Sequence, residues 1–309
     1  MISINENFWS NVEKDLKYVL YTDTDSLFLN VPKLVPKSPE QALEFADMLG
    51  VEINAVIEDF TINGILAKLG IGADQNQTFY KTELVADSIL FVDVKKNYAY
   101  TELAHKGKIN SEPRIEYTGI PVVKSNFSKL SQNIIKELVE NIGLSKNVTS
   151  AAQVKSAIND LGQEFVGRIN ELSDKGELTE VGVPCKWGSG SYKSEPAAVI
   201  AMRLYNTIFN VELFRPMGSA LHVPIIVHNP KLLETYINPI KETSMFYLNK
   251  IPTTNLTYLA VPYDHDPEVI KAKLAELHIE IDKVKLWEIV YGKTAQRIVN
   301  TIKTSYKIK

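Results

Sequence analysis

The chain has 309 residues, of which 45% are hydrophobic and 23% are charged. This composition is typical of a folded globular protein and excludes a mainly disordered chain, and the length allows two domains of ordinary size. The net charge of −3 is unevenly distributed, because residues 1–120 carry 11 basic and 18 acidic side chains whereas residues 121–309 carry 23 and 19. An acidic half beside a mildly basic half suits a metal-binding region beside a polyanion-binding region, but proteins that bind no nucleic acid show it too.

The sequence predicts neither a membrane span nor export. No apolar run approaches the roughly 18 residues of a bilayer helix, and residues 1–10 lack the basic and apolar regions of a signal peptide. The single cysteine, Cys185, excludes an intramolecular disulfide and a cysteine-rich zinc site, which fits a reducing compartment. We therefore expect a cytoplasmic protein, or one of the host cytoplasm if its source is viral.

The first part of the chain predicts a β-hairpin followed by a long helix. Residues 17–31 read KYVLYTDTDSLFLNV, which is two short β-rich runs separated by a polar Thr-Asp-Thr-Asp tip. Ser38 is placed to cap the next helix, with Pro39 in the first helical position and Gln41 completing a capping box. We expect this helix to run towards Lys68.

The rest of the chain predicts a strand-rich stretch and then a helical one. Between residues 77 and 119, four β-rich runs follow one another as an antiparallel meander: FYKTEL, SILFVDV, NYAYTEL and RIEYTG. Apolar residues three and four positions apart, together with cap signals, then predict helices at residues 127–142, 150–172, 196–209, 266–277 and 282–302. Strands are expected at residues 222–227 and 257–261, and a loop at residues 179–194. The predicted fold class is α+β: an antiparallel sheet with a long helix, followed by a largely helical domain with a few short strands.

Asp23 and Asp25 form the pattern with the most chemical content. Two residues apart in an extended stretch, they face the same side, and a hairpin tip presents them with little backbone in the way. Mg²⁺ takes one or two protein carboxylates, keeps several waters and completes its shell with substrate phosphates, so such a pair suffices for phosphoryl or nucleotidyl transfer. An isolated D-x-D pattern is more often a pair of solvated turn residues.

Three segments together resemble one protein family. Residues 21–26, YTDTDS, resemble the motif C hairpin of family B DNA polymerases, usually written Y-G-D-T-D-S. Residues 95–98, KKNY, look like the K-K-x-Y motif of that family at the start of a strand, and residues 119–125, GIPVVKS, are similar to the stretch where its palm gives way to its helical thumb. The resemblance implies that residues 1–121 are the C-terminal half of a polymerase palm and that residues 122–309 are a thumb that binds duplex DNA.

The sequence also departs from the family. Thr22 stands where the family has glycine, and a β-branched residue tolerates extended backbone but not positive φ, so we expect a slightly different turn. No motif A like D-x-x-S-L-Y-P-S, no motif B like K-x-x-x-N-S-x-Y-G and nothing like the exonuclease or fingers is present. The family keeps these regions before motif C, whereas this sequence has its first Met about twenty residues before it. We therefore expect one subunit of a split polymerase, an arrangement that resembles certain bacteriophage enzymes.

The resemblance implies roles for the carboxylates. Asp25 would bridge two Mg²⁺ ions, for which Mn²⁺ could substitute, and Asp23 would support it. Glu83 would lie near the active site and bind metal weakly, although a solvent-facing strand glutamate fits the sequence equally well. The substrates would be a dNTP and primer–template DNA. A partner chain with the exonuclease, fingers and motif A has to supply the remaining carboxylate and the triphosphate-binding residues, so the DNA-directed DNA polymerase would be active only with that chain.

Seven residues are candidates for DNA contacts by the same resemblance. The K-K-x-Y lysines would follow the minor groove at the primer terminus, where every base pair presents an acceptor, and the tyrosine would contact a primer phosphate. Residues after Gly119 would touch the primer backbone, and those in the Gly/Ser-rich loop would touch phosphates farther along the duplex. Lysines at a strand edge also prevent edge-to-edge association, and charges in loops are usually only solvated. The seven candidates are Lys95, Lys96, Tyr98, Lys124, Ser125, Lys186 and Lys193.

Three other functions stay open on the sequence. A D-x-D turn also binds Mn²⁺ and a nucleotide-sugar diphosphate in glycosyltransferases, but these need a nucleotide-binding domain upstream and only 22 residues precede Asp23. Residues 23–27, DTDSL, resemble the nucleophile motif of haloacid-dehalogenase-type phosphatases, which need alternating strands and helices where residues 77–118 read as consecutive strands. A non-catalytic DNA-binding module derived from a polymerase thumb shares every feature and differs only in lacking partner-dependent activity.

Overall fold

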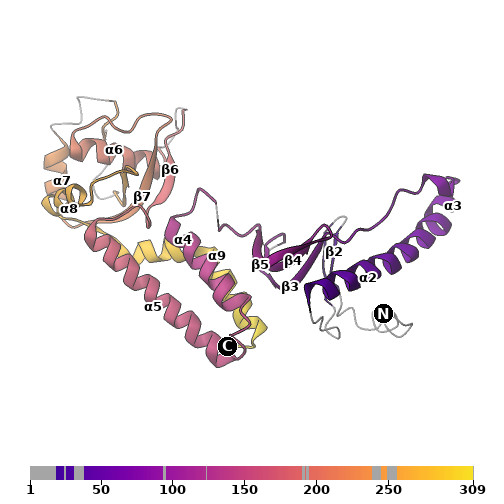
Figure 1. Cartoon of the computed structure of the whole chain (residues 1–309). Coiled ribbons are helices and arrows are strands. Elements are labelled where there is room, and N and C mark those ends of the chain that lie inside the picture. Colours follow the sequence, from indigo (N-terminus) through magenta and orange to yellow (C-terminus); the bar gives the residue numbers. More distant parts are fainter. Residues whose placement is uncertain are drawn as a thin grey trace. The chain divides into compact units, whose positions relative to one another are not determined.

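The protein divides into two compact units in the computed structural model (Figure 1). Unit 1 comprises Met1–Ile89 and Tyr100–Glu116, and unit 2 comprises Leu90–Ala99 and Tyr117–Lys309. The fold is α+β with antiparallel sheets, as the sequence predicts. The structure describes residues 19–23, 26–30, 38–92, 95–122, 124–189, 192, 195–238, 245–248 and 256–308.

Unit 1 begins with the predicted hairpin. Strands β1 (Val19–Asp23) and β2 (Ser26–Leu29) pair antiparallel, and the pairing closes on Asp23 and Ser26. Thr22 lies in the ladder opposite Leu27, so this β-branched residue occupies the extended backbone that it favours. The two residues at the tip, Thr24 and Asp25, lie outside the described residues, as does the side chain of Asp23.

The long helix that follows begins at its predicted cap and continues to the region of Lys68, as expected. Helix α2 (Pro39–Asp59) starts at Ser38, whose Oγ accepts the Gln41 backbone N–H at 3.4 Å. It continues through a π-helical segment, η1 (Phe60–Leu66), into α3 (Ala67–Leu69), and the chain leaves it at Gly70 with φ of 68°. A left-handed residue at this position is the common way to terminate a helix, and glycine adopts it without a steric penalty.

Residues 71–83 correct one predicted strand. Apart from a short 3₁₀ turn, η2 (Ala73–Gln75), this segment has no regular structure, so the run FYKTEL is a strand only from its last residue. It lies along α2 instead: the Tyr80 N–H donates to the Asn54 side-chain oxygen at 2.5 Å, and the Asn54 amide donates back to the Tyr80 carbonyl at 2.7 Å. A side chain therefore takes the backbone groups that a neighbouring strand would otherwise have paired.

The predicted meander forms a three-stranded sheet in the order β3-β4-β5. The strands are β3 (Leu84–Phe91), β4 (Tyr98–His105) and β5 (Lys108–Thr118). A buried carboxylate, Glu102, joins β4 to β5, because its Oε1 accepts bonds from Asn110 at 3.1 Å and from Arg114 at 3.0 Å. Burial acts to raise the pKa of Glu102, but the bonds from Asn110 and Arg114 outweigh it, so the pKa lies below its usual value and the group stays ionised.

Unit 2 contains an antiparallel helical layer. Helix α4 (Lys129–Glu137), the π-helical segment η3 (Leu138–Gly143), α5 (Ala151–Lys175) and α9 (Lys283–Ser305) pack together, with α5 and α9 side by side in Figure 1. Fully buried side chains fill the space between them, among them Leu130, Ile134, Ile135, Leu138 and Ile169. These are the positions at which the sequence shows helical spacing, so burial of one apolar face explains why the helices form.

Helix α9 is broken at Gly292. This residue has φ of 58° and ψ of 177°, a backbone conformation that is essentially restricted to glycine. The break interrupts the helical hydrogen bonds near Val290, and the buried Ser131 hydroxyl of α4 donates to the Val290 carbonyl at 2.7 Å. A polar side chain in the core thus satisfies a carbonyl that the broken helix leaves without its usual partner.

The rest of unit 2 is a small sheet covered by helices. Strand β7 (Ser219–Val227) pairs with β6 (Val183–Lys186), β8 (Tyr258–Val261) and β9 (Ile279–Ile281), all antiparallel. The helices of this part are α6 (Ala197–Phe209), which packs on β8, and α7 (Pro230–Ile237) and α8 (Pro267–Glu276). Residues 179–194 were predicted to be a loop, but they contain strand β6. The glycines and prolines in this segment favour a loop, and its four strand residues adopt an extended conformation by pairing with β7. The sequence analysis also missed α7 and β9.

Candidate nucleic-acid interface

The turn between β3 and β4 presents the two lysines of the K-K-x-Y match. The Val92 N–H donates to the Asn97 carbonyl at 2.9 Å, and Lys95 and Lys96 lie exposed in the turn. Lys96 has φ of 62°, which is uncommon and mildly unfavourable for a residue with a side chain. Surrounding contacts must hold this conformation, and a backbone outlier of this kind is a reason to look for a functional constraint.

Gly119 provides such contacts. It lies at the end of β5 with φ of 71°, and a Cβ on it would collide with the Lys96 carbonyl oxygen and the Asn97 side-chain oxygen. Only glycine allows the two segments to approach so closely. The segment after β5, more than twenty residues along the chain, therefore packs directly on the K-K-x-Y turn.

Lys124 belongs to the same surface. Its ammonium group donates to the Gly119 carbonyl at 3.4 Å, while its own carbonyl accepts a bond from the Gln132 side chain at 2.9 Å. The second bond fixes the loop to the first turn of α4, and Ser125 is exposed beside it. The structure thus brings together Lys95, Lys96, Lys124 and Ser125 around Gly119, and we call these five residues the lysine surface.

Two tyrosines hold the strands behind the lysine surface. The ring of Tyr98 is half-buried and lies 5.8 Å from that of Phe91, measured between centroids. The Tyr117 hydroxyl donates to Glu140 of η3 at 2.5 Å, and burial together with this carboxylate raises the pKa of Tyr117. Tyr117 therefore stays protonated and ties the end of β5 to the helical layer. Tyr98 has a structural contact in addition to the phosphate contact predicted for it.

The predicted metal ligands are only partly described. The structure describes the backbone pair Asp23–Ser26 that ends the β1–β2 ladder, and Asp25 lies between these two residues in the sequence. Carboxylates are hard oxygen donors of the kind that Mg²⁺ prefers. Among the described residues, no three His, Cys, Asp or Glu side chains lie close enough to hold a metal ion, and Asp25 and the Asp23 carboxylate are outside that set.

The other predicted site residues lie elsewhere. Glu83 is exposed directly before β3, and its carbonyl accepts the Lys106 N–H at 2.7 Å. Lys186 is exposed at the end of β6, on the sheet formed by β6, β7, β8 and β9. Lys193 lies outside the described residues. The structure therefore groups the K-K-x-Y lysines with Lys124, and it does not group Lys186 with them.

His222 of β7, His228 directly after this strand, and Cys185 each contact neighbouring residues of the chain. His222 stacks on Tyr258 with 4.1 Å between ring centroids, and burial lowers its pKa to about 4. His228 contacts Glu280 at 3.0 Å. Burial raises the pKa of Cys185 to about 11, so the thiolate that nucleophilic catalysis needs is disfavoured.

Comparison with known proteins adds one distant structural likeness. No family model and no curated protein sequence matches the chain. Among solved structures, the chain is similar to the family B DNA polymerase from the hyperthermophilic archaeon Pyrobaculum calidifontis, with 16% sequence identity and a TM-score of 0.43. The alignment covers 78% of this chain and 24% of that polymerase, so the chain spans about a quarter of its length. A likeness this distant assigns no activity.

The helices were also compared with the requirements of a bilayer. In the described ranges, none combines the length and the apolar character that crossing a membrane requires.

Proposed function

We propose that this chain is one subunit of a split family B DNA polymerase, in which it supplies the motif C carboxylates and contacts to the primer duplex. Residues 1–121 form the C-terminal half of the palm, and residues 122–309 form the thumb. The reaction is template-directed nucleotidyl transfer from a dNTP to a primer end.

The lysine surface is the observation that carries this proposal. The K-K-x-Y and G-I-P segments are separate in sequence and each is a weak match alone. Their direct packing through Gly119, with three lysines exposed around it, makes a single cationic surface from two segments that the family resemblance identifies independently. Clustered lysines of this kind bind phosphates and fix the register of a duplex without reading its sequence.

Each residue of this surface has a role in the proposal. Lys96 donates to the minor-groove acceptors that every correct base pair presents at the primer end, so it tests pairing geometry. Lys95, Lys124 and Ser125 hold the primer backbone, and the Tyr98 hydroxyl contacts a primer phosphate. Lys186 and Lys193 would contact phosphates farther along the duplex.

The carboxylates of the hairpin have the catalytic role. Asp25 and Asp23 hold the metal at the hairpin tip, with Glu83 as a weak further ligand. Two Mg²⁺ ions, or Mn²⁺ in their place, would lower the pKa of the primer 3′-hydroxyl and neutralise the triphosphate. The observed pairing of β1 with β2 supports this role, because the family resemblance places the two aspartates in the segment that joins a pair of antiparallel strands.

A partner chain completes the site. None of the 309 residues matches motif A or motif B, so the second metal-binding carboxylate and the triphosphate-binding cations come from residues outside this sequence. The partner therefore carries the exonuclease, the fingers and the first half of the palm.

Reconstitution tests the proposal. Proteins captured with the tagged chain from its native source are identified, and the one that carries a motif A aspartate is purified. We expect no primer extension from either chain alone and template-directed extension from the mixture. Extension by the rigorously purified chain alone would contradict the split arrangement. A mixture that binds the primer duplex but never extends it would favour the non-catalytic DNA-binding module.

A further inference from the structure

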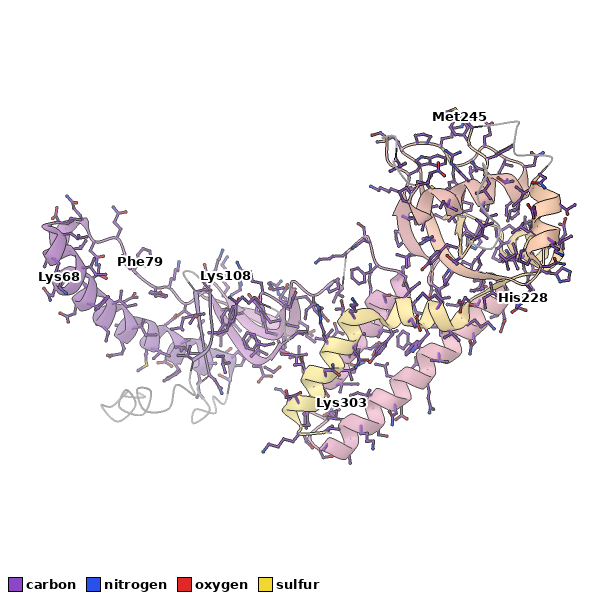
Figure 2. All side chains as sticks on the ribbon, turned by 180° about the vertical axis from the view of Figure 1, so that it is seen from behind. Lys68, Phe79, Lys108, His228, Met245 and Lys303 are labelled. Carbon is purple, nitrogen blue, oxygen red and sulfur yellow. The ribbon has the colours of Figure 1, made fainter. Side chains whose placement is uncertain are left out.

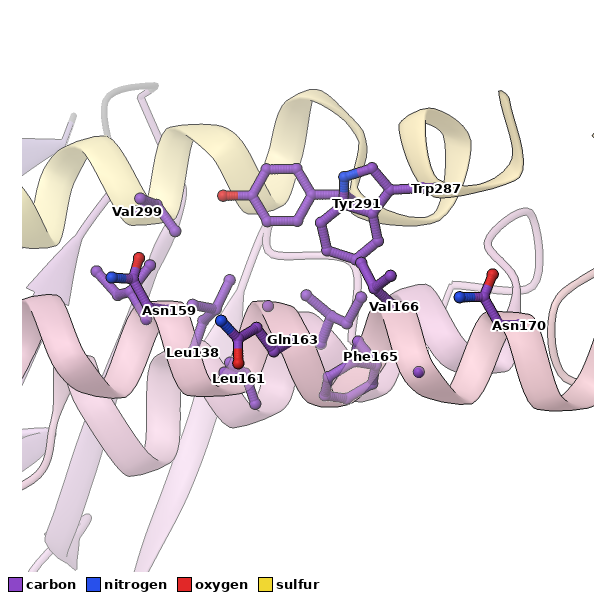
Figure 3. A pocket seen from close by; sticks show the side chains of 14 residues that line it. Leu138, Asn159, Leu161, Gln163, Phe165, Val166, Asn170, Trp287, Tyr291 and Val299 are labelled. Carbon is purple, nitrogen blue, oxygen red and sulfur yellow. The ribbon is translucent and has the colours of Figure 1, made fainter. Parts of the chain in front are cut away.

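A groove in unit 2 lies between α5 and the first half of α9, and the function proposed above does not use it. It encloses about 550 Å³, and its floor is apolar, formed by side chains such as Leu138 and Phe165. Figure 3 shows Trp287 and Tyr291 projecting from α9 towards the exposed face of α5. Both walls belong to the same compact unit.

The α5 wall combines apolar side chains, such as Leu161 and Val166, with carboxamides and glycines. Asn159, Gln163 and Asn170 line it at helical spacing, and within the described parts of the chain their carboxamides make no side-chain hydrogen bond. Gly162 and Gly167 lie between them in the middle of a 25-residue helix. A Cβ on either glycine would meet no atom within 4 Å. An interior glycine weakens a helix relative to alanine, and no packing inside the chain requires these two, so they leave room for something outside it.

The α9 wall is aromatic. The rings of Trp287 and Tyr291 are stacked, with 5.0 Å between centroids and 23° between planes. Neither the indole N–H nor the hydroxyl has a hydrogen-bond partner among the residues that the structure describes. Burial raises the pKa of Tyr291, so its hydroxyl stays a donor at neutral pH. A planar ligand can stack on this pair and still find donors and acceptors on the opposite wall.

Two cations extend the groove past the break at Gly292. Lys293 and Arg297 line an adjoining cavity of about 470 Å³. Neither forms an ion pair within the described ranges, whereas Lys285 of the same helix pairs with Glu288 at 3.1 Å. Glu288 also borders this cavity, but its carboxylate is held by that lysine. The groove therefore leads from an aromatic, amide-lined part to a cationic part.

We propose that this groove binds one or two nucleotides of single-stranded DNA. A base stacks on the Trp287–Tyr291 pair, and the carboxamides, which both donate and accept, bond its edge without selecting one base. The phosphates lie at Lys293 and Arg297. Duplex DNA does not fit this chemistry, because its base faces are already stacked and its edges already paired. The choice of DNA over another strand of heteroaromatic anions rests on the proposed function.

The test fills the groove without weakening the fold. Gly162→Leu places a large side chain in the groove at a helical position that favours leucine over glycine, and Ala152→Leu adds similar bulk to the exposed first turn of α5 as the control. Binding of labelled (dT)₈ by the full chain is measured by fluorescence anisotropy, beside an octamer of the same charge that lacks bases. We expect Gly162→Leu to weaken (dT)₈ binding about tenfold or more, the size of losing one base stack, with an unchanged or higher Tm. Ala152→Leu should bind like the native chain.

Two further readouts locate the strand. Binding of (dT)₈ should quench the tryptophan emission of the native chain but not that of Trp287→Phe, whose remaining tryptophans are Trp9 and the buried Trp187, so loss of the quenching assigns it to Trp287. The paired change Lys293→Gln with Arg297→Gln should make the salt dependence shallower by about 1.4, or 0.7 for each phosphate on a single strand.

Equal affinity for (dT)₈ and the octamer without bases would overturn the proposal, as would a Gly162→Leu chain that binds (dT)₈ normally. These measurements need neither partner nor catalysis. A chain that does not bind (dT)₈ in the groove would therefore leave the primer-extension result unaffected. Absence of primer extension would likewise leave the result on (dT)₈ binding unaffected.

Discussion

The two units differ in how completely they cover their apolar side chains. In unit 2, helices α4, α5 and α9 enclose a continuous set of fully buried residues, and α6 and the second sheet enclose another. In unit 1, the buried apolar residues within the described ranges are few: Ala42, Phe45 and Leu49 in the first half of α2, and Ala104 in β4. Unit 2 also has exposed apolar residues, among them Leu213, Met217 and Val284.

Many of the exposed apolar residues of unit 1 lie along one continuous helical segment, formed by α2, η1 and α3. From residue 51 to residue 69, apolar side chains occur all round α2, η1 and α3, and the segment beside them adds another (Figure 2, where Phe79 is labelled). A helix that is apolar all round is normally buried. Five side chains are between 61% and 72% exposed: Val51, Val56, Phe60, Leu69 and Phe79.

This contrast fits a thumb that folds on its own core and a half-palm that needs a cover. An exposed apolar surface of this length normally marks an interface. If the proposed partner provides the first half of the palm, it would cover this helical segment. The partner would then explain both the exposed apolar side chains of unit 1 and the absence of motifs A and B from this sequence. The contrast between unit 1, which contains the proposed catalytic hairpin, and the well-packed unit 2 leads to testable expectations.

The largest effect is expected at the hairpin of unit 1. Asp25→Asn should lower the rate of nucleotide incorporation by the reconstituted enzyme by about three orders of magnitude or more, because a metal-binding carboxylate acts in the transition state. Assembly and duplex binding should change little. The matched control is Asp74→Asn, an exposed aspartate on η2 of the same unit. Single-turnover kinetics in saturating Mg²⁺ provide the measurement, and a near-normal kcat for Asp25→Asn would remove the motif C assignment.

The same leucine truncation should behave differently in the two units. Leu130→Ala removes a side chain with no exposure from the unit 2 core, and we expect it to cost about 2–5 kcal/mol of unfolding free energy. Leu69→Ala, at a position that is 66% exposed, should change it by only about 0.5 kcal/mol. Urea unfolding monitored by circular dichroism measures both. If Leu69 belongs to the partner interface, Leu69→Ala should instead weaken assembly with the partner, and a large loss of stability in the isolated chain would show that this helical segment is not uncovered.

The stability of unit 2 should depend on pH through a buried histidine, His222. The pKa of His222 is lowered to about 4 in the folded chain, against 6.5 for an ordinary histidine, because burial disfavours the imidazolium. The neutral form therefore stabilises the fold fully above pH 6.5, and this contribution is lost as the pH falls from 6.5 towards 4. The loss is about 3 kcal/mol over that range. His222→Phe keeps the ring stack on Tyr258 but cannot titrate, so its unfolding free energy should fall less between pH 7 and pH 4.5, and parallel curves for the two proteins would contradict the account.

The smallest effects are expected on the lysine surface. Lys95→Ala and Lys124→Ala should each make log K against log salt shallower by about 0.9 for duplex DNA, equally for matched and mismatched primers. Lys96→Ala should weaken extension from matched ends more than from mismatched ends, because a mismatch has already displaced the groove acceptor. Extension efficiency on both primers and the salt slope are measured for each variant. An equal loss on both primers with a shallower slope would place Lys96 on the backbone.

The sequence predicts those elements whose local signals agree with their packing. The hairpin, α2, the meander and most helices of unit 2 formed where cap residues and apolar spacing indicated. Strand β6 could not be predicted, because four residues with glycine and proline nearby become a strand only by pairing with β7. The run FYKTEL was wrongly predicted as a strand. Its residue types are strand-like, but the Asn54 side chain forms the hydrogen bonds with the Tyr80 backbone that a neighbouring strand would otherwise form.

The sequence predicts the individual residues of the lysine surface, but not that they lie together. The motif matches named Lys95, Lys96 and Lys124 separately, and nothing in the sequence shows that they meet. The contact depends on Gly119, whose positive φ and missing side chain allow the approach. A glycine after a strand and before Ile-Pro was the available signal. The groove between α5 and α9 could not be predicted from the sequence, because its two walls are more than a hundred residues apart in the chain.

The most direct test of the central claim is where the metal binds. In the assembled complex with primer–template and dNTP, Fe²⁺ replaces Mg²⁺ and reduces added hydrogen peroxide to hydroxide and a hydroxyl radical, which cuts the backbone next to the bound ion. Ascorbate returns the resulting Fe³⁺ to Fe²⁺. The account predicts cleavage of this chain at the turn that follows β1, around residues 23–25, which excess Mg²⁺ suppresses and Asp25→Asn abolishes. Cleavage elsewhere in the chain, or cleavage at that turn that Asp25→Asn leaves unchanged, would contradict it.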